Sequence, residues 1–220
     1  DCPMASPSIV WTVADLLQQF DPISAARIRH DPPPGTATEK DVIEIEAREN
    51  RVYELVDRVL VEKVMWYYES YLAILIARFV GNFVEEHNLG IVAGADGMIK
   101  LAPDLVRIPD VSFVSWGRLP GGNVPQQAIP DLASDLAVEV ISEGNTPEEM
   151  ERKLREYFDA GVRLVWYVYP TTRSVKVYRS TDNMSELTGD QMIEGGDELP
   201  GFQLAVSQFF APANKRHEPS

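Results

Sequence analysis

The sequence predicts an α/β (α+β) fold in which a mixed central β-sheet is flanked by helices. Three observations support this prediction. Residues 146–161 carry strong helix signals and lie between two runs rich in β-branched and aromatic residues, which together form a strand–helix–strand crossover unit. A long amphipathic helix precedes this unit, and short alternating apolar runs lie around that helix. Since crossover helices join parallel strands and tight turns join antiparallel ones, the patterns together indicate a mixed sheet.

Length, composition and charge limit the classes of protein to which the chain can belong. With 220 residues, of which 45% are hydrophobic and 25% charged, the chain can bury a core of ordinary globular type. The net charge of −14 argues against a generally basic nucleic-acid-binding protein and disfavours anionic membranes. No apolar run is long enough to span a bilayer, and no basic segment followed by an apolar one opens the sequence. We therefore expect a cytoplasmic protein that does not bind a membrane.

Residues 1–48 are expected to form a helical N-terminal extension. Thr12 and Asp15 resemble an N-cap pair that begins a short helix. A second helical piece is expected at residues 22–28, and Thr38 is placed to cap a third helix. No set of catalytic side chains occurs in this extension, which suits a lid, a dimer arm or a docking segment. A homodimer is the expected assembly for this type of fold.

The main domain is expected to span residues 49–210, followed by a flexible tail at 211–220. It begins with a predicted hairpin over residues 53–63, whose apolar residues alternate around a turn at Asp57 and Arg58. Further strand-like runs occur at residues 91–93, 98–101, 106–114, 136–142, 164–168 and 175–178.

The long amphipathic helix is predicted from residue 66 to 88, because apolar residues recur there at steps of three and four. Gly90 is placed to end it. Glu69 is the unusual residue of this helix, since it stands on the flank of the apolar stripe that faces the core. Two interpretations stay open: its carboxylate turns outward and pairs with an arginine, or it points at the same site as the strand carboxylates.

Those carboxylates occur in stretches that otherwise have the composition of buried strands. Glu139 lies in the middle of the run 136–142, and burying an ionised carboxylate is costly unless a partner compensates it. Asp110 stands directly before the apolar run 111–114. Lys153 lies on the helix that follows Glu139, at the margin of its apolar face. A lysine at that position can reach back to the sheet.

These three side chains form the reactive set that the sequence offers. No phosphate-binding loop, nucleophile elbow or zinc-ligand motif accompanies them. Hard carboxylate oxygens suit Mg²⁺ or Mn²⁺, which makes Asp110 and Glu139 candidate ligands for such an ion. The metal would polarise a phosphodiester and lower the pKa of a bound water, while Lys153 stabilises developing charge. On the residues alone, a buried Glu139–Lys153 ion pair, with Asp110 only starting a strand, explains them equally well.

The order of these motifs resembles that of the Uma-two family, described as putative restriction endonucleases, in the PD-(D/E)XK nuclease-like superfamily. The resemblance covers roughly residue 53 to 210. The stretches that carry it are Tyr53-Glu54-Leu55-Val56-Asp57, Pro109-Asp110, Ala137-Val138-Glu139-Val140-Ile141-Ser142, residues 153–162 and Leu199-Pro200-Gly201-Phe202.

The resemblance implies a restriction-endonuclease-like core with a metal-dependent site for cleaving DNA. In that site Asp110 and Glu139 would bind Mg²⁺ or Mn²⁺. The superfamily usually places its lysine two residues after the acidic one, where this chain has Ile141. The resemblance therefore implies that Lys153 is a migrated catalytic lysine.

The resemblance also matches Glu69 to the superfamily's first-helix acidic residue, with Glu54 as the competing candidate. Two residues depart from the family pattern. Arg58 stands where the family often has glycine, and Tyr169 stands where an aspartate is common.

Three functions remain open at this point. The first is a metal-dependent endonuclease with DNA as its partner, which would require basic residues such as Lys100, Arg107 and Arg152 along the rim of the cleft. The second is a catalytically silent module of the same fold that binds a partner without cutting it. The third is a metal-dependent hydrolase that acts on a smaller substrate.

Overall fold

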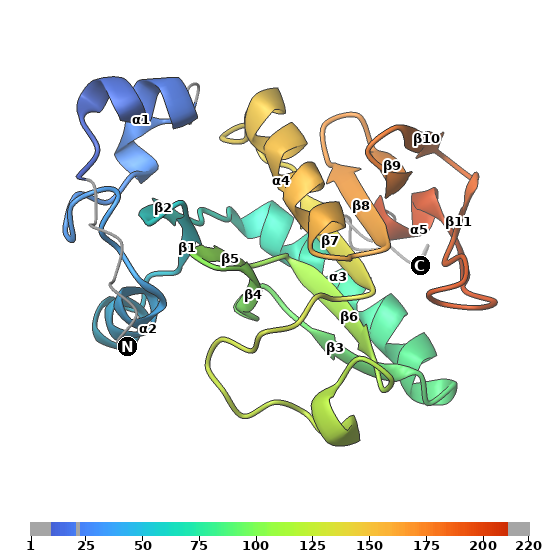
Figure 1. Ribbon diagram of the computed structural model, residues 1–220. Helices are drawn as coiled ribbons and strands as arrows, with labels where there is room; N and C mark the ends of the chain where they lie inside the picture. The colour runs from blue at the N-terminus through green and yellow to red at the C-terminus, as the bar shows by residue number, and fades with distance from the viewer. Residues whose placement is uncertain (1–9, 21–22, 211–220) are drawn as a thin grey trace, which may run out of the picture.

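The structure is a computed structural model that describes residues 10–20 and 23–210 of the chain (Figure 1). Its centre is a six-stranded sheet with the order β10-β9-β8-β7-β6-β3. Strands β7 and β8 are parallel, whereas the other neighbouring pairs of this sheet are antiparallel, which confirms the mixed sheet. The strands are β3 (Gly90–Ala93), β6 (Val111–Ser115), β7 (Leu136–Val140), β8 (Leu164–Tyr169), β9 (Ser174–Ser180) and β10 (Asn183–Thr188).

The parallel pair is joined by helix α4 (Pro147–Asp159), as the crossover pattern predicts. The hydroxyl of Thr146 accepts a hydrogen bond from the backbone N–H of Glu149 at 3.2 Å, and proline occupies the first helical position. Gly161 follows the helix with a φ of 92°, a conformation that glycine adopts without steric cost. These local signals fix the two ends of α4, and its apolar side packs on β7 and β8.

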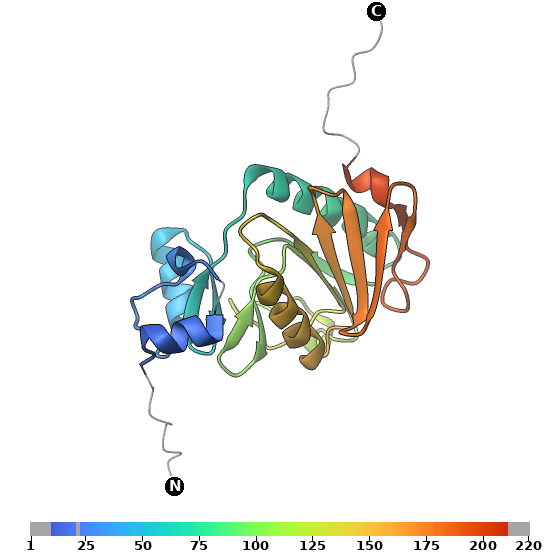
Figure 2. The same ribbon diagram turned by 90° about the horizontal axis from the view of Figure 1, so that it is seen from above.

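Helix α3 (Tyr67–Glu86) covers the opposite face of the sheet from α4 (Figure 2). Alternate residues of β7 divide between the two faces: Val138 packs into the core under α3, and Ala137 packs under α4. The residues of α3 in the main core are Leu72, Ala73, Ile76, Val80 and Val84.

The prediction that Gly90 ends this helix is wrong. The helix ends at Glu86, and Asn88 adopts the left-handed conformation with a φ of 51°. Asparagine tolerates that conformation better than most residues. Gly90 instead opens β3, where a Cβ atom would lie 2.0 Å from the carbonyl oxygen of Val114. The glycine therefore serves the close approach of β3 to β6.

A second sheet of four strands, in the order β2-β1-β5-β4, lies beside the first. The predicted hairpin is confirmed, and both turn residues, Asp57 and Arg58, have the positive φ angles (49° and 63°) of a tight two-residue turn. The run 106–114 is not one strand, because Pro109 cannot donate a ladder hydrogen bond and the chain passes there from one sheet to the other. The strands are β1 (Tyr53–Val56), β2 (Val59–Glu62), β4 (Ile99–Ala102) and β5 (Leu105–Arg107).

The N-terminal segments α1 (Val13–Phe20), η1 (Ala25–Arg27) and α2 (Glu39–Glu49) gather around this second sheet (Figures 1 and 2). Thr38 caps α2 through a reciprocal pair of hydrogen bonds with Asp41, as predicted. The second helical piece is shorter than expected, and its predicted start at residue 22 lies outside the described residues. The domain boundary after residue 48 stays a prediction.

The end of the described chain closes the core beneath α3. Its elements are β11 (Met192–Glu194), β12 (Gln203–Ala205) and α5 (Val206–Phe210). The remaining short helix, η2 (Pro120–Gly122), lies in the loop between β6 and β7. Phe202, Phe209 and Phe210 are buried in the main core, which confirms that this ending covers it. The predicted tail at 211–220 lies outside the described residues. None of the helices in the described ranges is both long and apolar enough to cross a bilayer.

Candidate functional site

The three side chains that the sequence singled out lie together. Asp110 precedes β6, Glu139 lies on β7 and Lys153 on α4, and all three line one small cavity. Lys153 Nζ is 3.0 Å from Glu139 Oε1. Asp110 Oδ2 accepts a hydrogen bond of 2.7 Å from the backbone N–H of Val140, directly after Glu139. Each of the three residues is 4% exposed. The fold thus builds one buried charged centre from them.

Glu54, on β1, lines the same cavity. Its Oε1 is 3.0 Å from Lys153 Nζ and accepts from the backbone N–H of Ile108 at 3.2 Å. Its Oε2 is 2.7 Å from Arg107 Nη1. Burial acts to raise the pKa of Glu54, but the charges of Lys153 and Arg107 outweigh it and lower the pKa to about 2. Glu54 is therefore ionised, with both oxygens engaged, and it holds Lys153 in place.

Glu69, on the first turn of α3, lines the same cavity. Its Oε2 is buried and, within the described part of the chain, has no hydrogen-bond partner. A buried carboxylate oxygen without a partner is costly, so this atom is suited to bind a water molecule or a cation. The location favours the second of the two interpretations, in which Glu69 faces the strand carboxylates.

Two further groups belong to the centre and were missed from the sequence. Lys63 Nζ is 2.7 Å from Asp110 Oδ1, and the hydroxyl of Tyr157 donates to Glu139 Oε1 at 2.5 Å. Tyr157 stands four residues after Lys153, which puts both on one side of α4, and this spacing was the available signal. Lys63 has no such signal, because it stands at the end of the hairpin, where lysines commonly lie on the surface.

The charges of the centre are unevenly compensated. Burial raises the pKa of Glu139, Lys153 opposes this effect, and the nearby Asp110 carboxylate adds to it, so the net pKa is raised. Burial lowers the pKa of Lys153, but Glu139 and Glu54 outweigh it and raise the pKa. A raised carboxylate pKa means that additional positive charge near Glu139 would be favourable. Lys153 therefore offsets the burial of the Glu139 carboxylate only in part.

The cavity between these side chains is small and lined by more carboxylates than cations. Its volume is about 20 Å³, which is room for a single water molecule or ion. Four carboxylates and three cations line it, so the side chains alone carry a net negative charge. Among the described residues, no three His, Cys, Asp or Glu side chains are grouped closely enough to hold a metal by themselves. A metal would thus take two protein carboxylates and complete its shell with water, as Mg²⁺ commonly does. The charged residues are Arg27, Glu54, Lys63, Glu69, Asp110, Glu139 and Lys153.

The basic residues expected along the rim are engaged with protein carboxylates. Lys100 Nζ is 2.7 Å from Glu39, and Arg152 Nη2 is 2.6 Å from Asp57. Arg107 is buried in the centre rather than on the rim. These three residues therefore do not form the row of unpaired cations with which a protein usually tracks duplex DNA.

Comparisons with known proteins agree with this architecture. A model of the Uma2 family, described as "Putative restriction endonuclease", matches residues 40–207. The fold is similar to the crystal structure of a putative nuclease of the DUF820 group from Anabaena variabilis, with a TM-score of 0.65 and 16% sequence identity. That match covers 72% of this chain and 89% of the other. None of the curated proteins compared with the chain matches it.

Proposed function

Because the chain belongs to the Uma2 family of putative restriction endonucleases, we propose that it is a metal-dependent nuclease that hydrolyses phosphodiester bonds in DNA. The observation that carries this proposal is the convergence of Asp110, Glu139 and Lys153 around a cavity the size of one ion. The homodimer and the cytoplasmic location remain predictions.

In this proposal Asp110 and Glu139 hold a Mg²⁺ or Mn²⁺ ion. The bound ion would polarise the phosphodiester and lower the pKa of a coordinated water. The hydroxyl of Tyr157 and the ammonium of Lys153 both contact Glu139 Oε1, so Glu139 keeps its Oε2 for the ion. The backbone N–H of Val140 fixes Asp110 Oδ2. Asp110 Oδ1 lies 2.7 Å from Lys63 Nζ, so Lys63 would move aside when Asp110 binds the ion through that oxygen. This arrangement fits the net negative charge of the cavity.

The two lysines supply the remaining positive charge. Lys153 is held between Glu54 and Glu139, and Lys63 lies against Asp110. As water attacks phosphorus and the bond to the leaving oxygen breaks, negative charge grows on the phosphoryl oxygens. Ammonium groups in a water-poor site stabilise such charge strongly. Lys153 is therefore assigned to charge stabilisation, with Glu54 as its positioning residue.

A second candidate is the catalytically silent nuclease fold that binds a partner without cutting it. It is favoured by one observation: each of the basic side chains around the centre lies within 3.0 Å of a protein carboxylate oxygen. Those contacts involve Arg27, Lys63, Lys100, Arg107, Arg152 and Lys153.

A cleavage assay on plasmid and oligonucleotide DNA with Mg²⁺, Mn²⁺ or EDTA separates the two candidates. The nuclease proposal expects metal-dependent cleavage that falls by about 100-fold or more in Asp110→Asn and in Lys153→Met. Asp104→Asn is the matched control, since Asp104 is exposed in a turn at a φ of 58° that asparagine also tolerates. Equal cleavage by all variants would remove the assigned roles, and no cleavage by the wild type would favour the silent module.

A further inference from the structure

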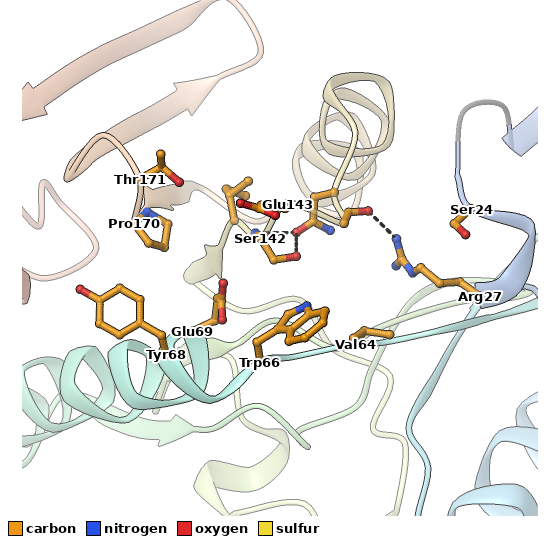
Figure 3. Close-up of a pocket in the computed structure, with 13 residues that line it drawn as sticks. Ser24, Arg27, Val64, Trp66, Tyr68, Glu69, Ser142, Glu143, Pro170 and Thr171 are labelled. Atoms are coloured by element: carbon orange, nitrogen blue, oxygen red, sulfur yellow. Dashed lines mark hydrogen bonds between the residues drawn. The ribbon is translucent and has the colours of Figure 1, made fainter.

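A pocket of about 490 Å³ adjoins the small cavity of Asp110 and Glu139 (Figure 3). Its volume lies in the range of pockets that hold small ligands, about 300–1,000 Å³. Because the pocket and the cavity share lining residues, a ligand in the pocket lies next to the cavity. The residues that line both are Arg27, Val64, Glu69, Ser142 and Asn145.

Two aromatic side chains form one side of this pocket. Figure 3 shows Trp66 and Tyr68 rising from the beginning of α3, with Pro170 and Ser142 across from them. Trp66 is 65% exposed and Tyr68 is 41% exposed, although large aromatic surfaces are normally buried. Exposed aromatic rings inside a pocket are typical of sites that stack planar ligands.

The polar groups of the pocket are suited to a neutral ligand with hydrogen-bond donors. Its carboxylates, Glu69 and Glu143, accept hydrogen bonds and would repel a phosphate. Arg27 lines the pocket, but its guanidinium makes two bonds of 2.9 Å to the buried Glu149 carboxylate and a third to the backbone of Glu62. A nucleobase offers a planar face for stacking and exocyclic amino groups for carboxylates. A phosphate would find no uncommitted cation in the described lining.

The carboxylate cavity and the pocket thus fit different parts of one nucleotide. The phosphodiester lies at the cavity under the proposed function, and the base lies against Trp66 and Tyr68. A base that is stacked and paired in a duplex cannot enter such a pocket. A duplex also carries one negative charge per about 1.7 Å, twice the density of one strand, which an acidic protein with paired rim cations tolerates poorly.

We propose that the pocket of Trp66 and Tyr68 binds an unpaired nucleobase, and that single-stranded DNA is the substrate class of this protein. The inference rests on the proposed function for the role of the neighbouring cavity. It assigns Trp66 as a stacking residue that determines specificity for unpaired strands.

Fluorescence anisotropy with a labelled single-stranded oligonucleotide, and with the same strand in a duplex, tests this inference. Binding is measured in EDTA and again with Ca²⁺ in place of Mg²⁺. We expect the single strand to bind at least tenfold more tightly than the duplex. Trp66→Ala is expected to weaken single-strand binding by about tenfold, whereas Trp66→Phe, which keeps a ring, stays close to the wild type.

The matched control is Tyr67→Ala, because Tyr67 is the adjacent aromatic residue, is 92% exposed and does not line the pocket. This variant should bind like the wild type. Duplex binding as tight as single-strand binding, no effect of Trp66→Ala, or no single-strand binding in either condition would overturn the inference. Because binding is measured without cleavage, base-dependent binding by a protein that never cuts DNA would refute only the proposed function. Efficient cleavage of duplex DNA that Trp66→Ala does not affect would refute only the assignment of the pocket to an unpaired base.

Discussion

Replacement of Glu54 by glutamine tests whether this residue holds the cations of the centre. Glu54 is 1% exposed and its two oxygens accept from Lys153, Arg107 and the backbone of Ile108. A glutamine keeps one acceptor oxygen but presents an NH₂ group to a cation. Arg107 still has Glu156 as a partner. The free energy of unfolding should therefore fall by about 3 kcal/mol, the lower end of the range for breaking a buried ion pair.

The lowered pKa of Glu54 gives a second estimate of the same size. A shift from 4.5 to about 2 corresponds to about 3 kcal/mol. Because the folded-state pKa lies below the unfolded one, this stabilisation is present above pH about 4.5 and is lost as the pH falls towards 2. The difference between wild type and variant is therefore expected at neutral pH and should shrink in acid.

Urea unfolding, followed by circular dichroism at neutral pH, measures this difference. Glu54→Gln is expected to unfold with about 3 kcal/mol less stability, equivalent to a fall of roughly 6–12 °C in melting temperature for a chain of this size. Glu151→Gln, on the exposed side of α4, is the matched control and should lie within about 0.5 kcal/mol of the wild type. If the two variants unfold alike, Glu54 does not compensate the buried charges of Lys153 and Arg107.

Three other outcomes are expected. Gly90→Ala should destabilise the protein by about 3 kcal/mol, because the new Cβ meets Val114 O, whereas Gly94→Ala, with nothing within 4 Å, should be nearly neutral in the same unfolding assay. Asp135→Asn should cost about 2 kcal/mol at neutral pH, because the buried carboxylate loses its charge-assisted contacts to two partly exposed arginines and to a backbone N–H. Burial acts to raise the pKa of Asp135, but those contacts lower it below its usual value of 3.8. The deficit should therefore begin to shrink as the pH falls below about 4, and a deficit that stays constant in acid contradicts this. Mn²⁺ at about 100 times its Kd should stabilise the wild type by about 3 kcal/mol in thermal unfolding and leave the stability of Asp110→Asn unchanged. Equal shifts in melting temperature for both proteins would mean that the ion binds elsewhere.

The parts of the fold that the sequence predicted correctly are those with local signals. The helix α4 carries its N-cap, its first-position proline and its closing glycine within a few residues, so the crossover unit follows directly. Glu139 and Asp110 were identified because a charge interrupts or introduces an apolar run. A pattern of this kind can be recognised from a few neighbouring residues, without knowledge of the contacts they make in the fold.

The parts that were missed depend on distant partners. Arg107 and Glu54 are 53 residues apart, and nothing in either neighbourhood indicates the other. Tyr157 has the pattern of a core residue because its ring is apolar, while its hydroxyl partner, Glu139, lies 18 residues upstream. The break at Pro109 did have a signal, but the apolar residues on both sides of the proline favoured one long strand.

Anomalous scattering from crystals grown with Mn²⁺ would show directly whether the centre of Asp110 and Glu139 binds a divalent metal. We expect one peak between the carboxylates of Asp110 and Glu139, and its loss in crystals of Asp110→Asn. A peak only at other residues, or none while Lys63 and Lys153 keep their contacts to the two carboxylates, would contradict the claim that this centre binds a divalent metal.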